Sequence, residues 1–433
     1  MKLVIVGLGI MGQYCAKELA PKVETVYISS SKSAEEIGKI LPGVRNYKKA
    51  DNEQEAVKDA DFVIFCVPTE KVYENMLRFL PYCKKGAIIS GQTSRKTPEA
   101  QAFDEYVGKN PGCGLELVTI HTMCDPSVTK ENTSKEILGI IRHNSSDGAY
   151  KRATAFYGDM SEHIEEFESV DEHDTRVANT QINTSRIFLS IASAFAKVGC
   201  FPFLNETYSS AFDVMKFALA MRAASKENHI YRGIQFGSEY GKSIVRHAIA
   251  VESELYSMIV SGRRKQYRDR VLAAKKRLFG SGKLEPILSD EVMRQFGKIL
   301  AVSPNSDFSP IQWAVDAAES GRNIFEDCKA TTPMYTSLLC LVDRLFNAEE
   351  GEALERAMAA PFDNPQLRAD DLDFDREIHG WSEALLLDNQ AAYDSRHARM
   401  RQRLDEKLLK EQVEKSKAIV RVCRESMKKA RRS

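Results

Sequence analysis

The N-terminal segment constrains this chain most, because an apolar strand runs directly into a glycine-rich turn. Residues 2–6 read as a buried strand, and the next six residues are Gly7-Leu8-Gly9-Ile10-Met11-Gly12. Gly7 permits the tight turn, Gly9 lets the backbone approach a pyrophosphate, and Gly12 lets the following helix pack against the strand. A second apolar run follows at 25–28. The pattern predicts a nucleotide cofactor at this turn, held in part by the N–H groups of the helix.

The end of that second strand bears on which nucleotide is bound. NAD-binding sheets of this kind place an acidic residue there for the ribose hydroxyl, whereas this chain has Ser29-Ser30-Ser31-Lys32. Hydroxyl groups and a cation suit a 2′-phosphate, which favours NADP over NAD, although an ordinary polar loop would look the same. Residues after later strands, Val67, Pro68 and Gln92, are further candidates to contact the cofactor.

Length and composition set the class of protein. The chain has 433 residues, 43% of them hydrophobic, and no charge-free apolar stretch long enough for a membrane helix, so two or three domains without a membrane partner are expected. Because residue 2 already belongs to the first strand, no signal peptide is expected. The nine cysteines are scattered and form no metal-ligand pattern, which indicates reduced thiols, a cytoplasmic location and no metal.

Periodicity divides the chain into a sheet part and a helical part. Short apolar runs predict further strands at 61–67, 86–90, 117–121 and 137–142. Long amphipathic helices are predicted at 175–197, 211–224, 230–261 and 263–278, with loops at 304–310 and 361–365. The expected fold is an α/β Rossmann-type dinucleotide-binding domain at 1–165, an all-α domain at 166–347 and a helical C-terminal extension at 348–433.

The C-terminal extension ends in a basic tail. Residues 396–433 hold 14 Lys or Arg and 5 Asp or Glu, whereas the whole chain has a formal net charge of +0. Such a tail could contact an anionic surface, but it lacks the interleaved aromatic residues of a nucleic-acid platform. We expect a solvated helix whose apolar positions Met400, Leu404, Leu408 and Val413 pack on the protein, and no nucleic-acid partner.

Polar residues at strand ends indicate the chemistry. Ligands of open α/β sheets bind beyond the carboxyl ends of the strands, and His121 follows the apolar run 117–120. A histidine there is a candidate general base, because its pKa lies near the working pH, or else a hydrogen-bonded core residue. A polar cluster, Glu172-His173-Asp174, opens the helical part and supports the first interpretation.

These residues together resemble the prephenate dehydrogenases of tyrosine biosynthesis, in particular the fungal NADP-dependent type. The resemblance covers nearly the whole chain. In order along the sequence it rests on Gly91-Gln92-Thr93-Ser94-Arg95-Lys96, His121, Glu172-His173-Asp174 with Thr180-Gln181, His229 to Gly233, and 370–374 with Trp381. This chain departs from many members in having Thr122 after the strand-end histidine and serines where relatives have an arginine.

The resemblance implies a dehydrogenase that forms a homodimer through its helical half and converts prephenate to 4-hydroxyphenylpyruvate, carbon dioxide and reduced NADP. His121 is the implied base, and Ser94 either bonds to the substrate hydroxyl or imidazole or caps the following helix. Arg222 is the implied anchor of a substrate carboxylate, with Arg232 in reserve. Contacts with substrate are also implied, less directly, for His173, Gln181 and His229, the first two alternatively serving a structural hydrogen-bond network.

Three alternatives stay open at this point. Arogenate differs from prephenate only by an amine in place of the keto oxygen, so the sequence does not separate the two substrates. The glycine turn also suits β-hydroxyacid dehydrogenases, but their lysine has no counterpart near Thr180, Gln181 and Asn183. An NADP-sensing binding protein without catalysis would not need His121.

Overall fold

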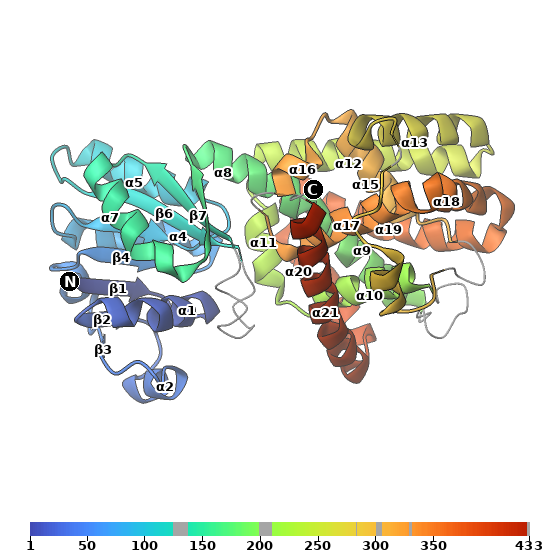
Figure 1. The fold of residues 1–433 in the computed structure, drawn as a ribbon. Helices are drawn as coiled ribbons and strands as arrows, with labels where there is room; N and C mark the ends of the chain where they lie inside the picture. Colours follow the sequence, from blue (N-terminus) through green and yellow to red (C-terminus); the bar gives the residue numbers. More distant parts are fainter. Residues whose placement is uncertain (124–136, 199–209, 283, 300–304, 329–330, 431–433) are drawn as a thin grey trace. The chain divides into compact units, whose positions relative to one another are not determined.

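The computed structural model describes residues 1–123, 137–198, 210–282, 284–299, 305–328 and 331–430, and divides the chain into two compact units. The sheet unit spans Met1–Val177 and the helical unit spans Ala178–Ser433 (Figure 1). The sheet unit therefore includes residues 166–177, which the sequence assigned to the helical domain. The helical unit includes 348–433, which the sequence treated as a separate extension.

The sheet unit contains an eight-stranded sheet with the order β3-β2-β1-β4-β5-β6-β7-β8. Its described strands are β1 (Lys2–Val6), β2 (Thr25–Ser29), β3 (Tyr47–Lys49), β4 (Phe62–Phe65), β5 (Ile88–Gly91), β6 (Glu116–Thr122), β7 (Ile137–His143) and β8 (His163–Phe167). Neighbouring strands run parallel except β6 and β7, which pair antiparallel. The Rossmann-type α/β fold is thus confirmed, with one reversed pair that the sequence did not predict.

Two hydrophobic cores cover the two faces of this sheet. One face packs on α1 (Ile10–Leu19), α2 (Ala34–Ile40) and α7 (Asp147–Tyr157). The other packs on α3 (Glu53–Val57), α4 (Thr69–Phe79) and α5 (Thr97–Lys109). The central strands are fully apolar because both of their faces are covered, whereas β8 has charged, mostly exposed residues and forms an edge.

The helical unit begins with a π-helical turn, η4 (Ala178–Ile182), which continues α8 (Val170–Val177) of the sheet unit. Its remaining helices of eight or more described residues are α9 (Asn183–Val198), α10 (Ala211–Ala224), α11 (Asn228–Gln235), α12 (Glu239–Val260), α13 (Arg264–Phe279), α15 (Phe308–Glu319), α17 (Pro333–Asn347), α18 (Glu352–Asp363), α19 (Pro365–Leu386), α20 (Gln390–Arg403) and α21 (Glu406–Ala430). The predicted helical character of this part is confirmed.

Two boundaries within the helical unit differ from prediction. The predicted helix 230–261 is broken between α11 and α12, where Gly237 has a φ of +74° that a helix does not allow. The predicted loop 361–365 is nearly absent, because Pro361 lies inside α18 and only Asn364 separates it from α19. Of the predicted loop 304–310, Phe308 to Pro310 already belong to α15, and residue 304 lies outside the described residues.

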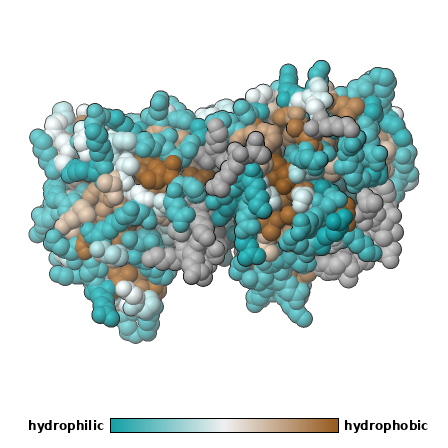
Figure 2. Space-filling model, viewed as in Figure 1, coloured by the Kyte–Doolittle hydropathy of each residue, from teal (hydrophilic) through white to brown (hydrophobic). Residues whose placement is uncertain are grey.

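The C-terminal helix packs on the helical unit by one face. Leu409, Gln412, Ser416, Ile419, Cys423 and Met427 are the buried residues of α21, which contacts α10 and α17. Of the predicted apolar contacts, Met400 and Leu404 are buried, while Leu408 and Val413 are half-buried. The visible surface is mostly hydrophilic, with separate hydrophobic areas (Figure 2). Among the described residues, no helix is both long and apolar enough to cross a membrane.

Candidate active site

The glycine turn between β1 and α1 has the geometry of a dinucleotide cradle. Gly7 adopts a φ of +96°, and its N–H donates to the carbonyl oxygen of Ser29 at 2.9 Å. A Cβ on Gly12 would lie 2.1 Å from the Gly7 carbonyl oxygen, so only glycine lets α1 sit this close. A Cβ on Gly9 would meet nothing within 4 Å. The backbone is therefore open there, and the first-turn N–H groups of α1, at residues 10–12, suit a pyrophosphate.

The residues after β2 fit a phosphorylated ribose. Ser29 ends the strand, and the Ser30 hydroxyl accepts the N–H of Lys32 at 3.3 Å. Ser31 is exposed and Lys32 is half-buried. The nearest acid on α2, Glu36, is bound to Ser33 in a capping box, and these hydrogen bonds lower its pKa. Hydroxyl groups and an ammonium group thus stand where an acid would repel a phosphate.

Three further cofactor candidates lie after β4 and β5. Val67 borders the turn, since its Cγ1 would be 3.0 Å from a Cβ on Gly7, and Pro68 is exposed at the start of α4. Gln92 is buried and donates to the Thr122 hydroxyl at 2.9 Å, while its oxygen accepts the Thr122 N–H at 3.1 Å. The threonine that replaces a proline after His121 is therefore tied to β5 through Gln92.

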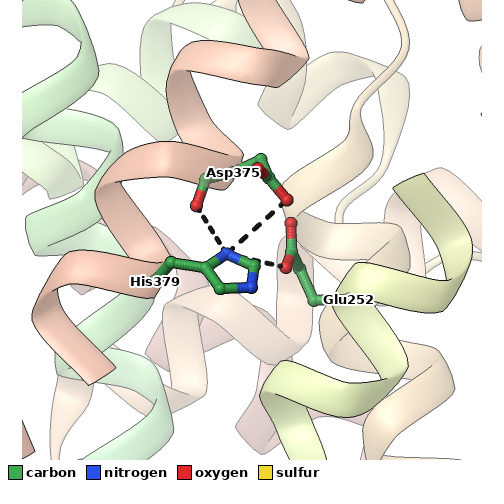
Figure 3. Close-up of side chains that lie close together, drawn as sticks. All are labelled: Glu252, Asp375 and His379. Atoms are coloured by element: carbon green, nitrogen blue, oxygen red, sulfur yellow. Dashed lines mark hydrogen bonds and ion pairs between the residues drawn. The ribbon is translucent and has the colours of Figure 1, made fainter. Parts of the chain in front are cut away.

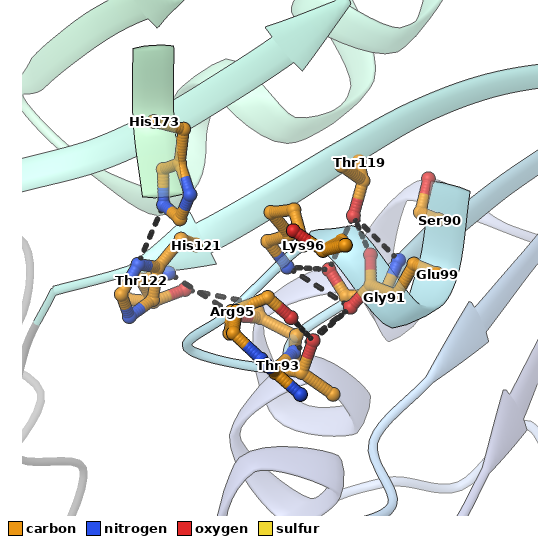
Figure 4. Close-up of polar contacts among 12 residues, drawn as sticks. Ser90, Gly91, Thr93, Arg95, Lys96, Glu99, Thr119, His121, Thr122 and His173 are labelled. Atoms are coloured by element: carbon orange, nitrogen blue, oxygen red, sulfur yellow. Dashed lines mark hydrogen bonds and ion pairs between the residues drawn. The ribbon is translucent and has the colours of Figure 1, made fainter. Parts of the chain in front are cut away.

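A chain of hydrogen bonds ends at His121, the last residue but one of β6. His121 Nδ1 lies 2.9 Å from His173 Nε2, and His173 Nδ1 lies 2.8 Å from Asp174 Oδ1 (Figure 4). We call these three residues the relay. His173 comes from α8, which the sequence brings back to this sheet edge after β8. Because β6 carries His121 and α8 carries the other two, the relay joins residues separated by 52 positions.

Protonation of the relay follows from its acceptor end. The Asp174 carboxylate accepts the N–H groups of Lys96 and Thr97, both at 2.8 Å, and these bonds with that from His173 lower its pKa despite burial. As an ionised acceptor it fixes the proton of His173 on Nδ1, so Nε2 of His173 must accept from His121 Nδ1. The lone pair of His121 is then on Nε2, which is the atom able to take a proton.

Burial keeps both imidazoles neutral. His121 is 5% exposed and His173 is fully buried. Burial, followed by the charges of His173 and Lys96, holds the pKa of His121 well below its usual range. Burial also lowers the pKa of His173, against the opposing effect of Asp174. At neutral pH the relay therefore presents an unprotonated His121, ready to act as a base.

A buried ion pair supports the loop before the relay. Lys96 and Glu99 have fully buried side chains, and Lys96 Nζ lies 3.1 Å from Glu99 Oε1 and 3.0 Å from the Gly91 carbonyl oxygen. The Glu99 carboxylate also accepts the hydroxyl groups of Thr93 and Thr119 (Figure 4). These bonds satisfy both buried charges and fix the chain between β5 and α5.

Ser94 lies in this loop but does not cap the helix. The cap position of α5 is Lys96, and its side chain makes no capping bond. The carboxylate of Asp174, from α8, accepts the first helical N–H groups instead. The structure therefore rules out the capping alternative for Ser94 and leaves its half-buried hydroxyl for another role.

The predicted cationic residues lie in the helical unit on different helix contacts. Arg222 of α10 is buried, and its Nη1 lies 3.4 Å from the Ser416 hydroxyl of α21. Arg232 of α11 forms an ion pair with Asp394 of α20 at 2.6 Å. His229 of α11 is exposed. Arg232 is thus already neutralised by a carboxylate.

Gln181 lies in the π-helical turn η4. Its side chain is 6% exposed, and its Nε2 is a buried donor with no hydrogen-bond partner in the described structure. Single π turns inside α-helices are frequent at functional sites, because they re-aim side chains. An unpaired buried amide of this kind is suited to a ligand acceptor.

Sequence reasoning missed the parts that hold the base. It assigned no role to Asp174, Lys96, Glu99 or Thr119, although the first two lie within segments that it singled out. A buried Lys-x-x-Glu pair at a helix start, next to a strand-end histidine, was the available signal. His173 was predicted to contact substrate, whereas both of its ring nitrogens are engaged in the relay and the ring is fully buried.

Comparison with known families gives matches over both units. Residues 182–425 match the family described as the 6-phosphogluconate dehydrogenase C-terminal domain. Residues 2–90 match the family described as NADP oxidoreductase coenzyme F420-dependent.

Two curated proteins and one solved structure are similar to this chain. The NADP-dependent prephenate dehydrogenase of Saccharomyces cerevisiae is 25% identical over 406 residues, covering 90% of this chain and 86% of its own. A probable NADP-dependent prephenate dehydrogenase of Schizosaccharomyces pombe is also 25% identical, covering 90% of both. The crystal structure of prephenate dehydrogenase from A. aeolicus with hydroxyphenyl propionate and NAD+ is 18% identical, with a TM-score of 0.47, covering 62% of this chain and 94% of that one.

Proposed function

This chain belongs to the 6-phosphogluconate dehydrogenase C-terminal domain family, and from that premise we propose that it is an NADP-dependent prephenate dehydrogenase. The reaction is the oxidative decarboxylation of prephenate to 4-hydroxyphenylpyruvate and carbon dioxide. The observation that carries the proposal is the relay, which holds a neutral imidazole with its lone pair on His121 Nε2. Two curated relatives bear this name over 90% of the chain.

The chemistry asks one proton acceptor of the protein. His121 Nε2 takes the proton of the ring C4 hydroxyl as a hydride leaves C4, and C4 becomes a carbonyl carbon. Bound NADP supplies the acceptor for that hydride. Cleavage of the bond between C1 and its carboxylate then releases carbon dioxide, and its electron pair makes the ring aromatic. The resulting phenolate oxygen takes the proton back from His121, so no proton is consumed.

The relay residues behind His121 act by position and charge. While His121 holds the substrate proton, His173 Nε2 accepts its Nδ1–H, and the Asp174 carboxylate stabilises the positive charge through His173. His173 and Asp174 are therefore positioning residues. Ser94, half-buried in the loop before α5, is assigned to the substrate hydroxyl, as the matching motif implies.

The cofactor and substrate contacts are assigned residue by residue. The first-turn N–H groups of α1 at residues 10–12 hold the pyrophosphate, and residues 29–32 hold the 2′-phosphate. Val67, Pro68 and Gln92 border the nicotinamide. For the substrate carboxylates we assign Arg222 first, since Arg232 already pairs with Asp394. The unpaired Gln181 amide and the exposed His229 are further substrate contacts.

An assay of the purified chain tests the proposal. Prephenate with NADP is expected to yield reduced cofactor and 4-hydroxyphenylpyruvate, with a higher kcat/KM than prephenate with NAD. A higher kcat/KM with arogenate than with prephenate would reassign the substrate. Binding of NADP without turnover of either compound would identify a sensing protein and refute the enzyme. Light scattering and fractionation test the accompanying proposals of a cytoplasmic homodimer.

A further inference from the structure

Three ionisable side chains converge between two helices of the helical unit. Glu252 comes from α12, and Asp375 and His379 come from α19, which packs against α12 (Figure 3). One ligand atom of each residue lies within 4.8 Å of the other two. We call these three residues the α12–α19 cluster. The reaction proposed above uses none of them.

The separations in the cluster match those between ligands around one metal ion. His379 Nδ1 lies 3.4 Å from Glu252 Oε2 and 3.6 Å from Asp375 Oδ1. Ligand atoms placed about 2.1 Å from a common ion are roughly 3.0 to 3.5 Å apart in octahedral or tetrahedral arrangements. Small side-chain adjustments would therefore bring all three atoms into one coordination sphere.

Glu252 gives an independent indication of a missing partner. Its side chain is fully buried, and both carboxyl oxygens lack any hydrogen-bond partner in the described structure. Both oxygens lie on the side of the residue that faces the other two members (Figure 3). Burial, and next the neighbouring Asp375, raise the pKa of this carboxyl to about 10. A buried carboxyl that faces a second carboxylate is costly unless a cation compensates it.

The imidazole is held in an orientation that suits a ligand. The Ser253 hydroxyl donates to the Ile249 carbonyl oxygen at 2.8 Å, so its oxygen is available to accept from His379 Nε2 at 2.9 Å. A proton on Nε2 leaves the lone pair on Nδ1, which faces the carboxylates. Outer contacts of this kind orient metal-binding histidines. In the protonated ring, Nδ1 donates to the Asp375 carbonyl oxygen at 2.8 Å instead.

The surroundings allow an ion to enter and balance its charge. The side chains of His379 and Asp375 are 41% and 18% exposed, so water can reach the cluster and complete the coordination. Asp371 adds a second negative charge from α19, while the Arg186 guanidinium is the opposing cation that acts on Glu252. Arg186 is itself bonded to Asn183 and Ser382 rather than to the cluster.

We propose that the α12–α19 cluster binds one divalent transition-metal ion through Glu252, Asp375 and His379, with water as the remaining ligands. Two carboxylates and one imidazole suit Mn2+ or Zn2+. Such an ion would tie α12 to α19 and stabilise the helical unit. The proposal is independent of the proposed reaction, because neither the relay nor the nucleotide cradle contributes a ligand.

Titration of the full chain with Mn2+ after chelation tests the proposal, with free Mn2+ counted by electron paramagnetic resonance. Mn2+ avoids the competing thiols of the nine cysteines. We expect one ion per chain, and an at least tenfold weaker affinity for Glu252→Gln. The matched control is Glu254→Gln on the same helix, whose exposed carboxylate pairs with Arg270; it should bind like the wild type.

A second variant covers the case in which Glu252→Gln fails to fold. His379→Ala removes a partly exposed ring, and we expect it to weaken Mn2+ binding while keeping the circular dichroism of the wild type. Mn2+ should also raise the Tm of the wild type but not of either cluster variant. Equal Mn2+ affinity in the wild type and His379→Ala, or equal loss in Glu254→Gln, would overturn the site.

Discussion

The relay and the α12–α19 cluster are built from the same kinds of side chain, carboxylates and imidazoles, but differ in how their charges are satisfied. In the relay, Asp174 accepts from two backbone N–H groups, a hydroxyl and a histidine. In the cluster, the buried carboxyl of Glu252 accepts no hydrogen bond. A carboxylate with a full set of donors fixes the protons of its neighbours, whereas one without donors suits an external cation. Hydrogen-bond satisfaction, more than residue identity, therefore separates a proton-handling site from an ion-binding one.

Loss of the base is expected to have the largest effect. His121→Asn should lower kcat by about 10² to 10⁴-fold, because the amide cannot take the substrate proton. NADP affinity, measured by fluorescence quenching, should change little, since His121 is outside the glycine turn. Near-normal turnover would show that the relay is structural and would remove its contrast with the α12–α19 cluster.

Loss of the relay carboxylate should come next. Asp174→Asn is expected to lower kcat by roughly 100-fold, because an amide no longer fixes the His173 tautomer or stabilises its charge. Stability should fall by about 2 to 3 kcal/mol in urea unfolding, since four donors lose an ionised acceptor.

The matched control for this change is Asp171→Asn, an exposed position in the first turn of the same helix. It should leave both kcat and stability close to the wild type. A kcat loss in Asp174→Asn that is no larger than in Asp171→Asn would assign the carboxylate to folding alone.

The corresponding change in the cluster should cost much less stability. In metal-free protein, Glu252→Gln is expected to change the free energy of unfolding by less than about 1 kcal/mol, because no donor loses its acceptor. The raised pKa of Glu252, about 10, also means that the wild-type side chain is already neutral and close to glutamine in shape. Urea unfolding at neutral pH measures the difference. A loss as large as that of Asp174→Asn would end the contrast between the two sites.

The smallest effect concerns pH. The pKa of His121 lies well below its usual value of 6.5, owing first to burial, so the neutral base predominates at and above that pH. The kcat/KM of the wild type should therefore fall by less than about twofold between pH 7.5 and 6.5, and decline only at lower pH. Stability should follow the same direction: a depressed histidine pKa favours folding at neutral pH, and this contribution is lost as the pH falls below 6.5. A midpoint in kcat/KM above pH 6.5 would exclude His121 as the titrating base.

The sheet was predictable from the sequence where strands are buried on both faces. Apolar runs identify β1, β2, β4, β5, β6 and β7 to within a few residues. β8, with the sequence His-Ile-Glu-Glu-Phe, lies mostly exposed at an edge and therefore lacks this signal. β3 is three residues long with two of them exposed. The reversed pairing of β7 depends on tertiary contacts that periodicity does not encode.

The site was predictable as residues but not as a network. Strand ends and motif order single out His121 and His173, since both stand at positions where chemistry is expected. The contact between Asp174 and the N–H groups of Lys96 and Thr97 spans 77 or 78 residues and joins a side chain to backbone. No local pattern reports such a contact. The unpaired oxygens of Glu252 are likewise visible only once α12 and α19 are packed.

Asp174 performs two duties with one functional group, and this has a consequence for how the enzyme ages under heat or engineering. The same oxygens that tune the imidazoles also hold the first turn of α5. Fraying of that turn would therefore detune the base well before the domain melts. Thermal inactivation is then expected to precede global unfolding, and mutations that rigidify the start of α5 should extend the working temperature more than equally stabilising changes made elsewhere.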